Sequence, residues 1–131
     1  MSDWLRDFYR EVDKGNIDSF PAYCAADVMF LRGGAPPVRG LVEVMEAQRA
    51  FLSTIRSLSH EFVNVFTDGD TSVLEATVTY TRLDGRAVEV PSVTILHRTG
   101  GLVDSIRVYL DIAPVYAEVG QVAELSNEET V

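Results

Sequence analysis

The stretch TSVLEATVTYTRLDGRAVEVPSVTILHR, residues 71–98, predicts the central part of the fold. In its first half, apolar and polar residues alternate with the period of two that is typical of a strand with one buried face. One face carries Leu74, Ala76, Val78 and Tyr80, and the other carries Glu75, Thr77 and Thr79. Asp84-Gly85 is a strong hairpin signal, so we expect residues 86–98 to return as an antiparallel strand.

Pro91 lies in the middle of this second strand. Val90 precedes it and Val93 and Ile95 follow it, so the apolar residues change parity across Pro91-Ser92. One extra residue in a strand turns every later side chain to the opposite face, and proline removes a donor from the ladder. The pattern therefore predicts a β-bulge at Pro91-Ser92.

Outward from this hairpin, residues 58–67 and 102–110 predict two more strands, because both are rich in apolar residues and each borders a glycine-containing turn, after the first and before the second. Upstream, the apolar residues of 4–12 recur at helical spacing, and Gly15 follows where that helix would stop. A short helix with Pro21 in its first turn and a strand over 27–32 come next. A longer amphipathic helix then begins after Gly40. Helices followed by a four-stranded antiparallel meander predict an α+β domain with the helices on one face of a curved sheet.

The composition limits the classes of function. The chain has 131 residues, 47% of them hydrophobic and 24% charged, which is typical of one globular domain. We expect the domain to cover residues 1–117 and an acidic tail to cover 118–131. The net charge of −9 argues against a nucleic-acid partner, because phosphate binding needs clustered Lys and Arg.

The sequence also predicts the compartment of the protein and the absence of cofactors. No apolar run approaches the roughly 20 residues that a membrane span needs, and the N-terminus lacks the pattern of a secretory signal. A single cysteine, Cys24, permits no internal disulfide, so we expect a reducing, cytoplasmic compartment and a buried thiol. We expect no metal and no other cofactor, because the two histidines, His60 and His97, lack acidic residues at ligand spacing and no phosphate-binding loop is present.

Several motifs in order resemble the nuclear transport factor 2-like superfamily, and within it the SnoaL-like and ketosteroid isomerase-like proteins. The resemblance covers residues 3–117. The motifs are Phe8-Tyr9, Lys14-Gly15-Asn16-Ile17-Asp18, Ala26-Asp27-Val28-Met29-Phe30, Pro36-Pro37-Val38-Arg39-Gly40 and Ile106-Arg107-Val108-Tyr109-Leu110-Asp111. The resemblance implies a cystatin-like α+β roll, in which three N-terminal helices close a cone against the mainly antiparallel sheet around an apolar pocket. It also implies a homodimer formed through the sheet.

The catalytic residues of two known branches are missing at the matching positions. The base, tyrosine and acid of ketosteroid isomerases fall near Leu31, Phe8 and Val93, which are all apolar. The charged and polar set of the epoxide hydrolases falls near Thr79, Thr77, Val108, Met29 and Leu31. A shift of the alignment by one residue brings in Arg32 and Tyr80 instead. The sequence therefore predicts neither reaction.

Two carboxylates are candidates for catalysis. The resemblance turns the face with Glu75, Thr77 and Thr79 into the cone, where burial would raise the pKa of a carboxyl group toward that of a useful acid or base. Patterning alone favours the opposite reading, in which this polar face meets solvent. Asp111 matches an acid of SnoaL-like cyclases, and its structural alternative is to cap a short terminal helix that contains Pro114.

The predicted pocket wall combines aromatic and apolar residues with the threonines and one histidine. The expected ligand-binding residues are Phe8, Tyr9, Tyr23, Met29, Leu31, Phe51, Phe62, Thr77, Thr79, Val93, Ile95, His97 and Val108. Because a shared fold leaves the chemistry open, three functions remain. They are an isomerase, cyclase or dehydratase acting on an apolar small molecule, a binder of such a molecule, and a non-catalytic association module. The association module would have a filled cone and an outer face built from Val78, Tyr80, Leu96 and Tyr109.

Overall fold

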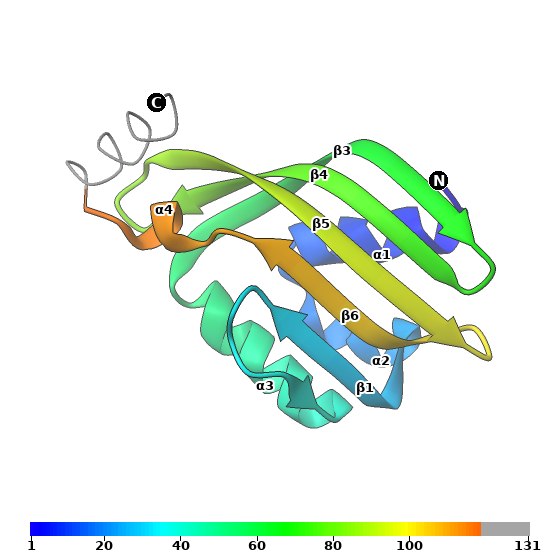
Figure 1. The fold of residues 1–131 in the computed structure, drawn as a ribbon. Helices are drawn as coiled ribbons and strands as arrows, with labels where there is room; N and C mark the ends of the chain where they lie inside the picture. Colours follow the sequence, from blue (N-terminus) through cyan, green and yellow to red (C-terminus); the bar gives the residue numbers. More distant parts are fainter. Residues whose placement is uncertain (119–131) are drawn as a thin grey trace.

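The computed structural model describes residues 1–118, so the predicted acidic tail lies outside the described residues from 119 onward. The predicted elements occur in the predicted order, and the structure adds the short elements η1 and β2. The elements are α1 (Asp3–Asp13), η1 (Ile17–Ser19), α2 (Phe20–Tyr23), β1 (Cys24–Arg32), β2 (Val38–Arg39), α3 (Leu41–Leu52), β3 (Ile55–Asp68), β4 (Thr71–Arg82), β5 (Ala87–Thr99), β6 (Leu102–Leu110) and α4 (Ala113–Tyr116). Figure 1 shows the strands as one sheet with α1 and α2 behind it. None of the described helices is long and apolar enough to cross a membrane.

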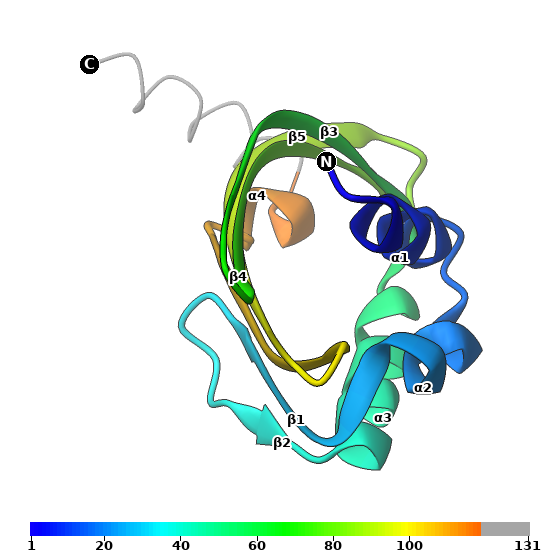
Figure 2. The same cartoon turned by 90° about the vertical axis from the view of Figure 1, so that its right-hand side faces the viewer.

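The sheet has the strand order β2-β1-β6-β5-β4-β3. Strands β3 to β6 form the predicted antiparallel meander, whereas β1 runs parallel to β6. In the end-on view of Figure 2 the sheet curves around an interior, with α1, α2 and α3 along its open side. The predicted α+β class, with helices closing a curved sheet, is therefore confirmed.

The predicted bulge at Pro91 is wrong. The pairing of β4 with β5 runs without a shift through Thr77↔Pro91, Ala76↔Ser92 and Glu75↔Val93. The change of apolar parity has another cause, because Ser92 and Thr94 are buried on the concave face whereas Val93 is exposed on the convex one. Pro91 lies just outside the pairing of β5 with β6, which begins at Ser92.

Irregularities occur elsewhere in the sheet, at Phe62/Asn64 in β3 and at His97/Arg98 in β5. Bulges add curvature and twist, which suits a sheet that wraps around its core. Gly40 precedes α3 with φ 96°, a conformation that side chains other than glycine rarely adopt.

The core fills most of the space between the helices and the sheet. The larger cluster of buried side chains joins α1, η1, α2 and α3 to the concave face, with Leu5, Phe8, Val44, Leu74 and Leu96 nearly inaccessible. A smaller cluster around Val78, Tyr80, Val90 and Val115 brings α4 against the other end of the sheet. Arg82 holds α4 there by donating to the carbonyl oxygens of Pro114 and Ala117.

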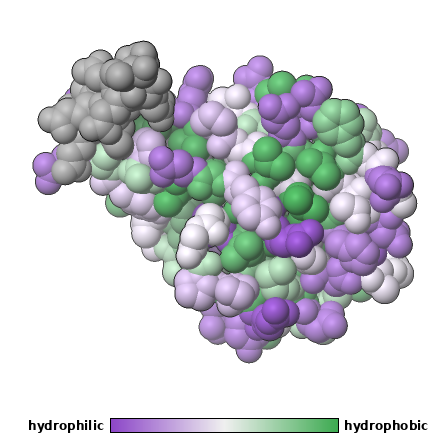
Figure 3. All heavy atoms as spheres, in the orientation of Figure 1, coloured by the Kyte–Doolittle hydropathy of each residue, from purple (hydrophilic) through white to green (hydrophobic). Residues whose placement is uncertain are grey.

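The convex face of the sheet is open in the single chain. Figure 3 shows hydrophobic side chains over the middle of this view, with hydrophilic ones around them. Of the four residues expected on the outer face of an association module, only Tyr109 is exposed, whereas Val78, Tyr80 and Leu96 point into the core. That composition of the outer face is therefore wrong, because the alternation of β4 and β5 turns those three side chains toward the helices.

Candidate functional site

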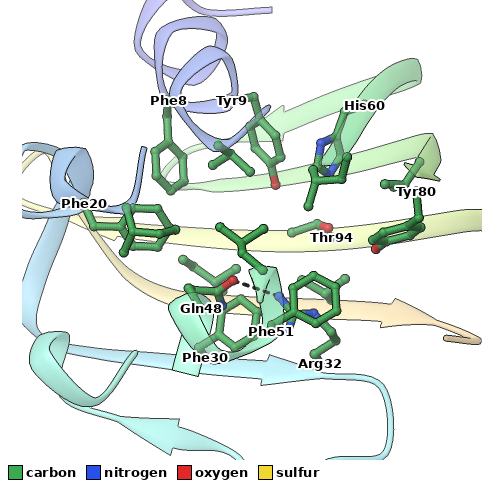
Figure 4. A pocket seen from close by; sticks show the side chains of 17 residues that line it. Phe8, Tyr9, Phe20, Phe30, Arg32, Gln48, Phe51, His60, Tyr80 and Thr94 are labelled. Carbon is green, nitrogen blue, oxygen red and sulfur yellow. Dashed lines mark hydrogen bonds between the residues drawn. The ribbon is translucent and has the colours of Figure 1, made fainter. Parts of the chain in front are cut away.

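An interior cavity lies between the helices and the concave face of the sheet. Its free volume is about 70 Å³, roughly half that of an apolar cavity of about 150 Å³ that holds benzene. Its lining residues come from nine of the elements: Phe8, Tyr9, Val12, Ile17, Phe20, Phe30, Arg32, Gln48, Phe51, Leu52, Leu58, His60, Val78, Tyr80, Thr94, Ile106 and Val108. The wall is mostly apolar, with a few polar groups aimed inward (Figure 4), which is the usual make-up of a small-molecule site.

His60 and Asp13 form the first polar group. Asp13 ends α1, and its carboxylate accepts a hydrogen bond from the His60 backbone N–H at 3.0 Å. Its other oxygen lies 2.6 Å from His60 Nδ1. A carboxylate only accepts, so Nδ1 carries a proton, and in the neutral imidazole Nε2 is then the nitrogen with the free lone pair. The double contact fixes the imidazole in the cavity wall, against the ring of Tyr9 at 4.9 Å.

Three hydroxyl groups lie near this histidine on the sheet and α1. Tyr9, Thr94 and Tyr80 are all buried and line the cavity, and in Figure 4 the hydroxyl of Tyr9 points toward Thr94. Burial raises the pKa of Tyr9 far above its ordinary value, although the neighbouring Thr94 hydroxyl acts in the opposite direction. Burial likewise raises the pKa of Tyr80 to about 12. Both phenols are therefore neutral hydrogen-bond donors near pH 7.

Arg32 and Gln48 form the second polar group, across the cavity from His60 (Figure 4). Arg32 Nη2 donates to Gln48 Oε1 at 2.9 Å. The guanidinium lies over the rings of Phe51 and Phe30, 3.8 Å and 4.8 Å from their centroids. Burial lowers the pKa of Arg32, whereas the Tyr80 and Tyr116 hydroxyls act to raise it. The planar cation is thus held between aromatic faces at the base of an apolar chamber.

The chain matches the model of the SnoaL-like domain over residues 5–106. It belongs to the SnoaL-like domain family. This SnoaL-like chain also superposes on solved structures with a nuclear transport factor 2-like fold. A protein of unknown function from Burkholderia pseudomallei has a TM-score of 0.80 and 18% identity over 89% of this chain and 100% of its own.

Two further solved structures match the SnoaL-like chain at similar identity. A protein with a ketosteroid isomerase-like fold from Catenulispora acidiphila, in complex with trimethylamine, has a TM-score of 0.80 and 16% identity over 92% of this chain and 94% of its own. An LEH-like epoxide hydrolase from M. tuberculosis has a TM-score of 0.72 and 16% identity over 83% and 80%. At these sequence identities the comparison shows a shared fold and nothing about a shared activity. No relative was found among curated protein sequences.

The structure places four of the predicted ligand-binding residues in the cavity wall of the SnoaL-like fold: Phe8, Tyr9, Phe51 and Val108. Tyr23 and Phe62 pack beside it, with ring centroids 5.1 Å from Phe8 and from Tyr9. The remaining seven do not line it: Met29, Leu31, Thr77, Thr79, Val93, Ile95 and His97. Strand parity explains the difference, because on β1, β4 and β5 the next residue along points inward instead. Arg32 and Tyr80, which the one-residue shift would bring in, are the ones in the cavity.

Neither predicted catalytic carboxylate lies in the cavity. Glu75 is exposed on the convex face and accepts a hydrogen bond from Asn64 Nδ2 at 2.7 Å, so the expectation that it faces into the cone is wrong. The apolar residues of β4 take the inward positions, because they bury more apolar area there. Asp111 is exposed and accepts from the backbone N–H of Ala113 at 3.0 Å. This bond closes a local turn just before α4, whose N-cap is Ile112, so Asp111 is not the N-cap that its structural alternative predicted.

The sequence reasoning missed His60 and Asp13. His60 shares its strand parity with Leu58 and Phe62, and this apolar alternation could have placed it on the inner face. Asp13 lies four residues after Tyr9 on the same helix, but nothing in the sequence links it to a histidine 47 positions away. Among the described residues there is no cluster of three or more potential metal ligands.

We expect the folded chain to lose stability at alkaline pH, because it buries the thiol of Cys24 and the phenol of Tyr80. Burial raises the pKa of Cys24 from 9.0 to about 12 and that of Tyr80 from 10.0 to about 12. The unfolded chain loses these protons first, so the native state binds more protons and its stability falls as pH rises from about 9 toward 12. Each group adds a slope of up to about 1.4 kcal/mol per pH unit. Urea unfolding between pH 7 and pH 11 measures it.

Two tyrosine variants separate burial from general effects of alkali. Tyr80→Phe keeps the buried ring and should flatten the decline above pH 10. Tyr109→Phe removes a hydroxyl from an exposed ring and should leave the decline unchanged. Equal pH dependence in the wild-type chain and in Tyr80→Phe would show that Tyr80 ionises as easily in the folded state as in the unfolded one.

Proposed function

We propose that the chain is an acid–base enzyme that moves a proton on a small carbonyl compound, with His60 as the proton carrier. The observation that supports this most strongly is the imidazole in the cavity wall, clamped through Nδ1 by the Asp13 carboxylate at 2.6 Å. A histidine held in this way presents Nε2 as a base, and the carboxylate on Nδ1 stabilises the imidazolium that forms when Nε2 takes a proton. Asp13 is then a positioning residue.

The hydroxyl groups of the cavity wall stabilise the negative charge that proton removal creates. Removal of a proton from the carbon next to a carbonyl leaves negative charge on the carbonyl oxygen, which donors in a water-poor site stabilise. Tyr9, Tyr80 and Thr94 are neutral donors in the same wall. The protonated His60 then returns its proton to another carbon, or to a hydroxyl that leaves as water. These outcomes correspond to an isomerase and to a dehydratase.

The size of the cavity restricts the substrate. With about 70 Å³ free, the chamber accommodates a molecule smaller than benzene or the reacting end of a larger one. Its apolar walls favour carbon-rich groups over sugars or nucleotides. A protein that only binds a ligand needs no oriented base, so the His60–Asp13 pair favours the enzyme over the binder. The open cavity likewise disfavours an association module with a filled cone.

A proton-exchange assay tests this function without knowledge of the natural substrate. Butanone, pyruvate and 4-hydroxy-2-butanone are incubated with the chain in D₂O, and NMR follows loss of the protons next to the carbonyl and loss of the hydroxyl. We expect at least one compound to react faster than in buffer with an equal concentration of free imidazole. Rates no higher than in that buffer for all three compounds would contradict the proposal.

A further inference from the structure

The guanidinium of Arg32 has more donors than partners. It carries five N–H groups, and among residues 1–118 it donates a single hydrogen bond, to Gln48 Oε1. In the same part of the chain no carboxylate lies within ion-pair distance of it. Arg32 is half-buried, and a cation taken partly out of water without a counter-ion costs free energy. The cavity therefore holds a positive charge that nothing in the described chain neutralises.

Gln48 leaves a second donor open beside it. The residue is only 7% exposed, its Oε1 is used by Arg32, and its Nε2 is buried without a hydrogen-bond partner among the described residues. Buried donors in native proteins are nearly always satisfied. Both residues line the same cavity, and Figure 4 shows their side chains meeting at its base. Within residues 1–118, neither the Gln48 amide nor the remaining Arg32 donors have an acceptor.

We propose that Arg32 and Gln48 form a subsite for the carboxylate group of a small ligand. A planar carboxylate matches the fork of the guanidinium and can accept from the amide with its second oxygen. Phosphate brings a third acceptor oxygen and a second charge, and the neighbouring walls, Phe30 and Phe51, cannot match them. The subsite deepens the proposed function by naming its substrate class: a short carboxylic acid with a carbonyl or hydroxyl group directed toward His60.

The proposal has an unusual consequence for stability. If Arg32 served the fold, its removal would lower the stability of the free chain. As a ligand-binding residue without a counter-ion it is a cost to the free chain, so Arg32→Met should raise the unfolding midpoint while it removes binding. A higher unfolding midpoint together with weaker binding distinguishes a ligand-binding role of Arg32 from a structural one.

Titrations with sodium propanoate followed by NMR test the subsite. Propanamide has the same shape without the charge, and inorganic phosphate is the alternative anion. We expect propanoate to bind in preference to both. Arg32→Met should weaken propanoate at least about tenfold, the loss expected when a charged hydrogen-bonding partner is removed. Gln48→Met, which keeps the side-chain length, should weaken it by less.

Arg98→Met is the matched control, because this arginine lies over the ring of Trp4 at 4.2 Å and does not line the cavity. Its affinity for propanoate should equal that of the wild-type chain. Equal affinity in Arg32→Met and the wild-type chain, or tighter binding of phosphate or propanamide, would overturn the subsite. Failure of the proposed function would look different: propanoate would still bind through Arg32, but no compound would exchange protons.

Discussion

The variant His60→Gln is expected to lower the rate of proton exchange by about 10²- to 10⁴-fold, the usual contribution of a positioned acid or base. Glutamine can keep the hydrogen bond to Asp13 through its side-chain amide, but it has no nitrogen that takes up a proton near neutral pH. The loss should therefore appear in kcat, with little effect on binding of the ligand. Initial rates of deuterium incorporation into the compound that the wild-type chain exchanges best measure it.

The chain provides a matched control for this experiment. His97 forms a similar pair with Asp104, at 2.7 Å between Nδ1 and the carboxylate, but its side chain is 43% exposed and does not line the cavity. His97→Gln should keep the wild-type rate. Asp13→Asn should also lower the rate, because an amide does not fix the tautomer that leaves Nε2 free. Full activity in His60→Gln would remove the histidine from the mechanism.

The variant Phe8→Ala is expected to lose about 3–5 kcal/mol of stability, the range for truncation of a buried aromatic side chain. Phe8 is 2% exposed, and its ring lies 5.1 Å to 5.6 Å from those of Tyr9, Phe20 and Tyr23. The variant loses the ring contacts that join α1 to α2 at the cavity wall. Because domains are stable by only about 5–15 kcal/mol, the urea midpoint should fall steeply.

An exposed phenylalanine tests whether this loss reflects packing. Phe66 is 63% exposed on β3, so Phe66→Ala should change the midpoint by little, as surface substitutions usually do. A loss below about 1.5 kcal/mol in Phe8→Ala would mean that neighbouring side chains collapse into the space. In that case the wall of the cavity is softer than its ring contacts indicate.

The two sides of the cavity show a division between stability and function. The aromatic wall around Phe8 packs densely, and truncation there should be costly. Arg32 and Gln48 instead place a charge and an open donor in the same interior. Apolar residues of equal size at these positions would make the free chain more stable. Polar groups that lower the stability of the free chain are typical of functional sites.

The sequence predicted the elements and the fold class because these depend on local patterns. The alternation of residues 71–83 and the turn at Asp84-Gly85 were sufficient for the central hairpin. The same kind of pattern failed at Pro91, because Val93 and Ile95 are apolar residues on the convex face rather than signs of a bulge. Periodicity shows which residues of a strand share a face. It identifies the buried face only when the other face is polar.

Only the tertiary structure decided the site. Glu75 remained a candidate until the curvature of the sheet and the position of the helices turned its face outward. His60 meets Asp13 across 47 positions, and Arg32 meets Gln48 across 16, through the packing of helices on the sheet. Contacts between distant segments leave no local pattern, so the sequence by itself determined a SnoaL-like cone, and the folded chain determined which polar groups face one another inside it.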